Sequence, residues 1–402
     1  MSRVVLASRI FAPESAAATF RLGALTKALR GAGHRVEVLT ATPPAALESA
    51  VDDEAAEGIE VSRWPVLRDG AGYVRGYVPY MSFDIPLALR LLLMDHADAV
   101  VVEPPPTTGA VVRTSLWLRS LLKQEPQIPY VYYGADVWSD ASESTGAPEW
   151  VVRVVRALEG YALRGAAETI AVSDGVADRV KELGALSVTV VPNGINTDIF
   201  DTAADGQITG KANPYFVYAG TASEWQGAEV FAQAMSQVLE FHPDTRLVFL
   251  GQGSSWPQLQ RIQTDLPAGA LELRPLVPAA EAAVWQRDAV GALVSVKPGL
   301  GYDFAYPTKV LAALACGTPV VFAGPGPAAA DVADHELGKA VEHDANAVAQ
   351  AMIDVLDEHL NQTDEQAFAQ SQRRRQWVLD NRSLAATGRG AAEVVNRALR
   401  SR

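Results

Sequence analysis

The strongest constraint in the sequence is a regular alternation of short β-branched runs with longer helical patterns, which begins at the first residues and restarts midway. This alternation predicts a parallel sheet with helices on its faces, because parallel neighbours need a helix-length crossover. Strands are expected before the restart at residues 4–7, 36–40, 99–102, 130–133, 169–172 and 188–191. Strands are expected after it at residues 216–219, 246–250, 271–273, 292–296 and 319–322.

The restart predicts two α/β domains of the Rossmann-like kind, facing each other across a central cleft. The chain has 402 residues, which is enough for two separate cores. The expected division is a domain at 1–200, a polar linker at 201–213, a second domain at 214–372 and a helical segment at 373–402. The last thirty residues hold 8 basic and 2 acidic side chains, and we expect them to cross back and pack on the first domain.

Composition excludes several classes of function. The net charge of -13 disfavours nucleic acid as a partner, since the average field repels polyanions. A single cysteine and six scattered histidines predict neither a disulfide framework nor a metal site, and no cofactor is expected. The start lacks a signal-like apolar run, and no run approaches membrane-spanning length. We therefore expect a cytoplasmic protein.

Glycines follow two strands of the second series, where parallel sheets place their ligands. Gly220 follows one strand, and Gly251 and Gly253 follow the next. Tight turns need glycine for backbone reasons alone, so a structural role for Gly251 and Gly253 stays open beside ligand binding. The dinucleotide-binding and P-loop glycine patterns are both missing from the sequence, which disfavours NAD binding and P-loop chemistry.

The most informative segment is residues 306–321. Pro307 suits the first turn of a helix, and Gly317 suits its C-terminal cap. Lys309 then lies in the first turn, where free backbone N–H groups and the helix dipole attract anions. A lysine there opposes the dipole, so a phosphate site is the functional interpretation, with a solvated surface lysine as the alternative.

Four stretches together resemble the GT-B glycosyltransferases, and within them family 4, whose members are retaining and use sugar nucleotides. The stretches are residues 11–14 running on to 33–40, residues 191–200, residues 218–221 and residues 307–321. The resemblance is strongest to a subgroup that builds cell-surface polysaccharides, in which an Asp-x-Trp follows a middle strand. Here that element is Asp136 to Trp138. The resemblance implies a GT-B fold and metal-independent transfer of a sugar from a nucleoside diphosphate.

Two departures from the family pattern concern the donor site. Many members carry two glutamates around the lysine helix, and Phe304 and Ala312 stand at those positions. Many members also hold the diphosphate with Arg and Lys, where this chain has Thr221 and Gln226. Lys309 and the helix start must then neutralise more of the diphosphate.

The resemblance and the strand ends together define the predicted site. Asp136 and Lys309 are the predicted catalytic residues, with capping of the next turn as the alternative for Asp136. The predicted donor-binding residues are Gly220, Thr221, Ser223, Gln226, Gly251, Leu276, Val277, Gly301, Tyr302, Asp303, Pro307, Thr308 and Lys309. A first-domain loop adds Glu14, Ser15 and Ala16, with helix capping as the alternative for Ser15. Asp303 is equally an ordinary loop carboxylate.

The acceptor stays open as a glycan, a lipid-linked molecule or a small molecule. Residues 73–94 combine aromatic, basic and strongly apolar positions, so docking at the inner face of a membrane and packing in the core are both open. Two alternatives to transfer also remain. One is a non-transferring GT-B protein such as a sugar-nucleotide epimerase, and the other is a non-catalytic sugar-nucleotide-binding protein.

Overall fold

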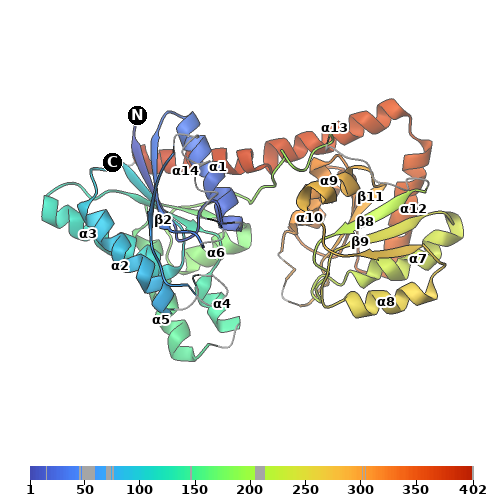
Figure 1. The fold of residues 1–402 in the computed structure, drawn as a ribbon, viewed down its shortest axis with the longest axis horizontal. Helices are drawn as coiled ribbons and strands as arrows, with labels where there is room; N and C mark the ends of the chain where they lie inside the picture. Colours follow the sequence, from blue (N-terminus) through green and yellow to red (C-terminus); the bar gives the residue numbers. More distant parts are fainter. Residues whose placement is uncertain are drawn as a thin grey trace. The chain divides into compact units, whose positions relative to one another are not determined.

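The structure is a computed structural model that describes residues 1–14, 16–44, 47, 59–68, 74, 77–144, 147–203, 213–300, 302–303 and 305–400. Ser15, Gly301, Phe304 and most of the predicted linker lie outside the described residues. The chain forms two compact units, which we call unit 1 (Met1–Asn193 with Leu384–Arg402) and unit 2 (Gly194–Ser383). Each unit has its own parallel sheet with helices on both faces (Figure 1).

The sheet of unit 1 has the strand order β3-β2-β1-β4-β5-β6-β7, with every pairing parallel. Val5 on β1 pairs with Glu37 on one side and Val100 on the other, so the order reverses between β1 and β4. Ligands of open α/β sheets bind at the carboxyl ends of strands beside such a reversal. The strands are β1 (Arg3–Ala7), β2 (Arg35–Ala41), β3 (Glu60–Trp64), β4 (Ala99–Val102), β5 (Tyr130–Gly134), β6 (Glu168–Ala171) and β7 (Val188–Val190).

Two cores cover the faces of this sheet. Helices α2, α3, α5 and α6 cover one face, and α1 and α14 cover the other, where they lie side by side (Figure 1). The helix α14 therefore belongs to unit 1, although about 190 residues of chain separate it from the rest of that unit. The helices of unit 1 are α1 (Ala17–Gly31), α2 (Tyr77–Leu93), α3 (Pro106–Lys123), α4 (Trp138–Ser144), α5 (Glu149–Gly165), α6 (Asp174–Glu182) and α14 (Leu384–Arg400).

Unit 2 repeats the plan with six parallel strands in the order β10-β9-β8-β11-β12-β13. Its order reverses between β8 and β11. The strands are β8 (Tyr215–Ala219), β9 (Arg246–Leu250), β10 (Leu271–Arg274), β11 (Gly291–Ser295), β12 (Val320–Ala323) and β13 (Gly338–Val341). The helices are α7 (Glu229–Phe241), α8 (Trp256–Asp265), α9 (Ala279–Arg287), α10 (Thr308–Ala315), α11 (Pro327–Asp334), α12 (Ala345–Asn361) and α13 (Asp364–Asn381).

The two-sheet α/β fold predicted from the alternation is confirmed, and each strand expected from a β-branched run is present. Two further strands, β3 and β13, lie at sheet edges. Neither contains a buried residue, so the apolar run that marks the central strands is missing from both. The boundaries between the two units fall after residues 193 and 383, whereas the sequence predicted domain ends at residues 200 and 372.

Candidate functional site

The site in unit 2 begins where β8 ends at the sheet reversal. Gly220 has φ +116°, a conformation that favours glycine, and its N–H donates to the carbonyl of Leu250 at 2.8 Å. A Cβ at Gly220 would lie 3.0 Å from Cε of Lys309. Glycine at this position therefore both makes the turn and leaves room for the lysine.

Gly251 and Gly253 support this turn from the neighbouring strand. A Cβ on Gly251 would lie 2.0 Å from the carbonyl oxygen of Gly220, and one on Gly253 would lie 2.2 Å from that of Ala222. These two glycines allow two backbone segments to touch. This close backbone approach is enough to explain why both positions are glycine. Gly251 does not line either of the cavities beside Lys309.

The loop after Gly220 is held by internal hydrogen bonds. The buried Tyr218 hydroxyl donates to the carbonyl of Thr221 at 3.0 Å, and the Ser223 N–H donates to Oε1 of Gln226 at 3.0 Å. Gln226 is itself buried. Its oxygen shapes the loop, while Thr221 stays exposed and Ser223 half-buried at the cavity wall.

The helix α10 faces this loop with its N-terminus. Pro307 occupies the N-cap position, one residue before the first turn, and provides no side-chain cap. The first N–H groups of the helix therefore have no partner from that cap. At the other end Gly317, with φ +80°, closes the helix as predicted, its N–H donating to the carbonyl of Leu314 at 3.0 Å.

Lys309 is the cation at this helix start. Its Nζ lies 5.3 Å from the centre of the Tyr218 ring, and it forms no ion pair or hydrogen bond with any residue that the structure describes. Burial lowers the pKa of Lys309 to about 8, because the charged form loses hydration without gaining a counter-ion. An anion that binds next to Lys309 would therefore stabilise the charged form of this lysine.

Two adjoining cavities share Thr221, Thr308 and Lys309, and we call them together the unit-2 pocket. The first has a volume of about 310 Å³. The pocket brings together these predicted donor residues: Gly220, Thr221, Ser223, Gln226, Leu276, Val277, Pro307, Thr308 and Lys309. Of the other predicted donor residues that the structure describes, Tyr302 and Asp303 lie on the loop before α10 and do not line the pocket.

Tyr302 and Asp303 have local partners. The Tyr302 ring stacks on Trp225 with centroids 4.8 Å apart, so it covers the outside of the β8 loop. A carboxylate oxygen of Asp303 accepts the Gly299 N–H at 3.1 Å. The structure therefore accounts for Asp303 as a loop carboxylate, with its second oxygen left for a ligand.

Gln286, on α9, lines the unit-2 pocket and was not singled out from the sequence. It is 3% exposed, and its side-chain oxygen has no partner among the described residues. Ala312, one of the positions where the family pattern has a glutamate, lines the same cavity. The pocket is therefore lined by the buried amide of Gln286, and it has the methyl group of Ala312 where the family pattern has a carboxylate.

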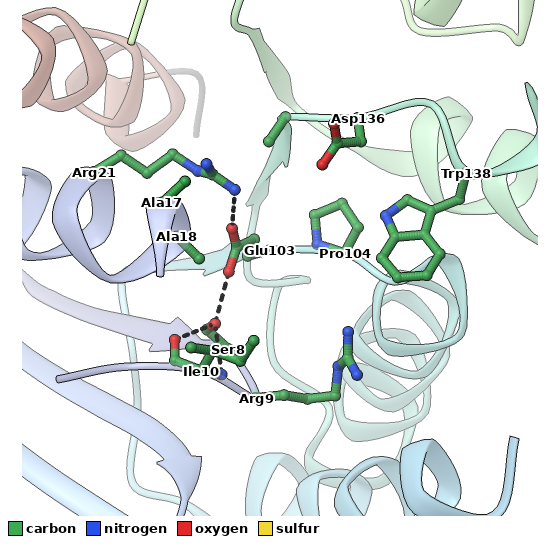
Figure 2. A pocket seen from close by; sticks show the side chains of 11 residues that line it. Ser8, Arg9, Ile10, Ala17, Ala18, Arg21, Glu103, Pro104, Asp136 and Trp138 are labelled. Carbon is green, nitrogen blue, oxygen red and sulfur yellow. Dashed lines mark hydrogen bonds and ion pairs between the residues drawn. The ribbon is translucent and has the colours of Figure 1, made fainter. Parts of the chain in front are cut away.

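A second pocket lies in unit 1 at the sheet reversal, and Figure 2 shows its lining. Its volume is about 210 Å³, and we call it the unit-1 pocket. The residues come from the segments after β1, β4 and β5 and from the starts of α1 and α4. They are Ser8, Arg9, Ile10, Ala17, Ala18, Arg21, Glu103, Pro104, Ala135, Asp136 and Trp138.

Asp136 is exposed in this pocket and forms no hydrogen bond or ion pair within the described part of the chain. The next helix, α4, is capped instead by Glu159 of α5, which accepts the N–H of Trp138 at 2.9 Å and of Ser139 at 3.0 Å. Because Glu159 performs the capping, the alternative role for Asp136 is removed. Its carboxylate is left for a ligand.

The predicted first-domain loop behaves differently. The Glu14 carboxylate accepts two hydrogen bonds from Arg68, at 2.9 and 3.0 Å, so both oxygens are occupied. The N-cap position of α1 is Ala16, without a side-chain cap. Ser15 lies outside the described residues, and Ala16 is next to Ala17 of the unit-1 pocket without lining the pocket itself.

Three charged residues of the unit-1 pocket were not among the predicted site residues. Glu103, which directly follows β4, accepts a hydrogen bond from Arg21 and another from the Ser8 hydroxyl at 2.8 Å. Arg9 is the second residue after the end of β1. The rule that ligands bind after strands at a sheet reversal would have selected Arg9, whereas the pairing of Arg21 with Glu103 spans 82 residues and leaves no local signal.

The comparison with protein families matches both halves of the chain. The glycosyl transferase 4-like domain matches residues 17–194, and the glycosyl transferases group 1 domain matches residues 213–358. The two domain matches together cover most of the chain, so the chain belongs to the glycosyltransferases, with a 4-like domain in its first half and a group 1 domain in its second half.

Individual relatives agree with this assignment at low identity. The chain is 28% identical over 216 residues to a GDP-mannose-dependent alpha-(1-6)-phosphatidylinositol monomannoside mannosyltransferase of Mycolicibacterium smegmatis, covering 51% of this chain and 55% of that protein. It is also 28% identical over 263 residues to a D-inositol 3-phosphate glycosyltransferase of Streptomyces avermitilis, covering 60% and 55%. The chain therefore spans about half the length of the curated relatives it matches.

A solved structure covers the whole chain. The structure of Anabaena HepE in complex with UDP aligns with a TM-score of 0.64 and 15% identity, covering 99% of this chain and 100% of HepE. At this identity the likeness concerns the fold, which is GT-B. Among the described residues, no helix is long and apolar enough to cross a bilayer.

Proposed function

We propose that this chain transfers a sugar from a nucleoside diphosphate to an acceptor hydroxyl, with retention of the anomeric configuration and without a metal ion. The observation that carries the proposal is Lys309, a partly buried cation without a counter-ion at the start of α10. A diphosphate is the anion that such a place suits, because a helix start and a cation both favour negative charge.

In the proposed reaction the bond between the anomeric carbon and the diphosphate oxygen breaks, and a bond to the acceptor oxygen forms. Negative charge grows on the leaving oxygen, so fixed donors near it lower the barrier. The unit-2 pocket offers Lys309, the first N–H groups of α10 and the Thr221 and Ser223 hydroxyls. The acceptor proton goes to the leaving phosphate on the same face, which the family resemblance implies.

We place the acceptor in unit 1, with Asp136 contacting a hydroxyl. The support is its free carboxylate in the unit-1 pocket. The acceptor class includes glycans, lipid-linked molecules and small molecules, and the two curated relatives are named for inositol-containing acceptors. Synthesis of a cell-surface polysaccharide in the cytoplasm, at the inner face of the membrane, is the proposed setting.

Calorimetry with UDP, GDP, ADP and dTDP tests the donor site. We expect one of these nucleotides to bind, and Lys309→Ala to weaken it about tenfold or more, as expected when a charged hydrogen bond is lost. Lys339→Ala is the matched control, because that lysine pairs with Glu358 on the surface of the same unit. Absence of binding by all four nucleotides contradicts the proposal.

Donor turnover separates transfer from the two alternatives. A transferase releases nucleoside diphosphate faster when acceptor is added. An epimerase changes the sugar of the donor with no acceptor present, and a binding protein leaves the donor intact. Chromatography of the matching sugar nucleotide, with and without a mixture of candidate acceptors, distinguishes the three outcomes.

A further inference from the structure

Arg9 is a buried cation in the unit-1 pocket that no carboxylate satisfies. It is 6% exposed, and its guanidinium lies 4.1 Å from the centre of the Tyr80 ring. Nη1 donates to the carbonyl of Val74 at 3.2 Å, and Nε has no partner. The Tyr80 side chain is a further hydrogen-bond partner of the guanidinium, which also lines the unit-1 pocket.

The other carboxylates near Arg9 do not neutralise it fully. The Glu103 carboxylate already accepts hydrogen bonds from Arg21 and Ser8. Asp84 is completely buried, and burial raises its pKa above the usual range, because the charged form is poorly solvated there. Buried charges are normally paired, so the region of Arg9 has room for one more anion.

The remaining walls of the pocket suit a ring with hydroxyl groups. Figure 2 shows the guanidinium of Arg9 on one side of the pocket and the carboxylate of Asp136 on another, with the Trp138 indole on a third side. The centre of the Trp138 ring lies 5.9 Å from the Arg9 guanidinium carbon. An apolar ring face with a few convergent polar groups is the usual composition of a small-molecule site.

We propose that the unit-1 pocket selects an acceptor whose hydroxylated ring carries an anionic group, a phosphate or a carboxylate, and that Arg9 is the residue that recognises this anion. The proposal rests on the proposed function, because it names the acceptor class of that reaction. Arg9 binds the anion through its guanidinium, Trp138 supports the ring, and Asp136 accepts a hydrogen bond from a ring hydroxyl. Arg21 takes no direct part beyond holding Glu103.

Calorimetry on the full chain, without donor, tests this assignment with matched probe pairs. The pairs are glucose 6-phosphate with glucose, glucuronate with glucose, and D-inositol 3-phosphate with inositol. We expect at least one charged probe to bind at least about tenfold more tightly than its neutral partner, which is the size of one charged hydrogen bond. Lys309→Ala should leave this preference unchanged, which shows that the anion is not in the unit-2 pocket.

Variants of Arg9 assign the preference to that side chain. Arg9→Met should remove the tenfold preference, and Arg9→Lys should keep part of it, since lysine retains the charge but not the planar fork. Arg119→Met is the control, because Arg119 is equally buried in unit 1 but donates to the carbonyl of Met94 at 2.7 Å, outside the pocket. Circular dichroism confirms that each variant is folded.

The outcomes separate this proposal from the proposed function. Equal affinity for charged and neutral probes, or an undiminished preference in Arg9→Met, overturns the assignment of Arg9. Loss of nucleotide binding in Arg9→Met with no change toward the probes also overturns it, because the anion would then be the donor's. Binding to phosphatidylinositol vesicles alone, lost in Arg9→Met, supports an anion carried by a lipid headgroup. A failed nucleotide assay leaves all these results measurable.

Discussion

At the scale of single residues, Lys309 makes nucleotide binding depend on pH. Its pKa is lowered to about 8 by burial in the free protein, and a bound diphosphate favours the protonated form. Below pH 8 the free lysine is already charged, so affinity is highest there. As pH rises through 8 the lysine must take up a proton to bind, so affinity falls by up to tenfold per pH unit.

Calorimetry from pH 6.5 to 9.5 checks this expectation, and repeating it in buffers with different ionisation enthalpies detects the proton that is taken up. Lys309→Arg should flatten the fall, because arginine stays charged throughout this range. A wild-type fall that persists in Lys309→Arg would assign the titration to another group.

Gln286 is the second residue-scale expectation. Its buried amide lines the unit-2 pocket, and the amide oxygen has no hydrogen-bond partner among the described residues. Buried polar groups are normally hydrogen-bonded, so we expect this amide to bind the nucleoside part of the donor. Gln286→Leu should weaken nucleotide binding about tenfold while the thermal midpoint of the free protein stays the same or rises. Gln263→Leu is a control in the same unit, since that amide donates to Leu271 outside the pocket. Unchanged affinity in Gln286→Leu would show that the amide is only a structural group.

These residues also show which parts of the candidate site can be predicted from the sequence. Lys309 and Gly317 were predictable because their signals lie within one helix and its ends. Gln286 and Arg21 were not, because each becomes part of a pocket only when distant segments pack together. The role of Asp136 needed the structure for the same reason: its competitor for capping, Glu159, lies on the following helix.

At the scale of elements, α2 has two apolar faces. One packs in the core through Phe83, Leu87 and Leu91. The other is exposed along the helix, at Val78, Met81, Ile85, Leu89 and Leu93. The sequence left docking and core packing open as alternatives for this segment, and the structure shows that one helix contains surfaces of both kinds.

The neighbouring helix α3 packs against α2 and also exposes apolar side chains, at Trp117, Leu121 and Leu122. The two helices together carry four basic residues, of which Arg119 is buried, and one acid, the buried Asp84, although the whole chain has a net charge of -13. A large apolar surface with local positive charge suits an anionic bilayer. We therefore expect this surface to be the peripheral membrane contact.

Sedimentation with phosphatidylglycerol vesicles measures the contact. Replacing Ile85 and Leu89 together by Glu should lower the bound fraction at least fivefold, since two exposed side chains lose their burial in lipid and add charge. The matched control replaces Leu360 and Phe368, which are equally exposed on unit 2. Equal loss in both double variants, or none in either, would contradict docking through α2.

At the scale of the whole molecule, the chain leaves unit 1 at residue 193 and returns to it at residue 384. The returning helix α14 is part of the unit-1 core, where Ala391, Val394 and Val395 are fully buried beside Leu22 and Leu25 of α1. Unit 1 is therefore incomplete until the last residues of the chain are present. Unit 2 is formed by one continuous stretch of sequence, so its core does not depend on α14.

This difference predicts separate responses to a substitution in α14. Val395→Asp places an unpaired charge in the unit-1 core, which costs several kcal/mol, and should open that unit locally. Hydrogen exchange followed by peptide mass spectrometry should show faster exchange in α1, β1 and β5 and no change in β8 to β12. Nucleotide should still protect the α10 peptide, because its pocket lies within unit 2. Glu393→Gln, on the exposed side of α14, should change neither unit. Faster exchange spread equally over both sheets would instead mean that the two units unfold together.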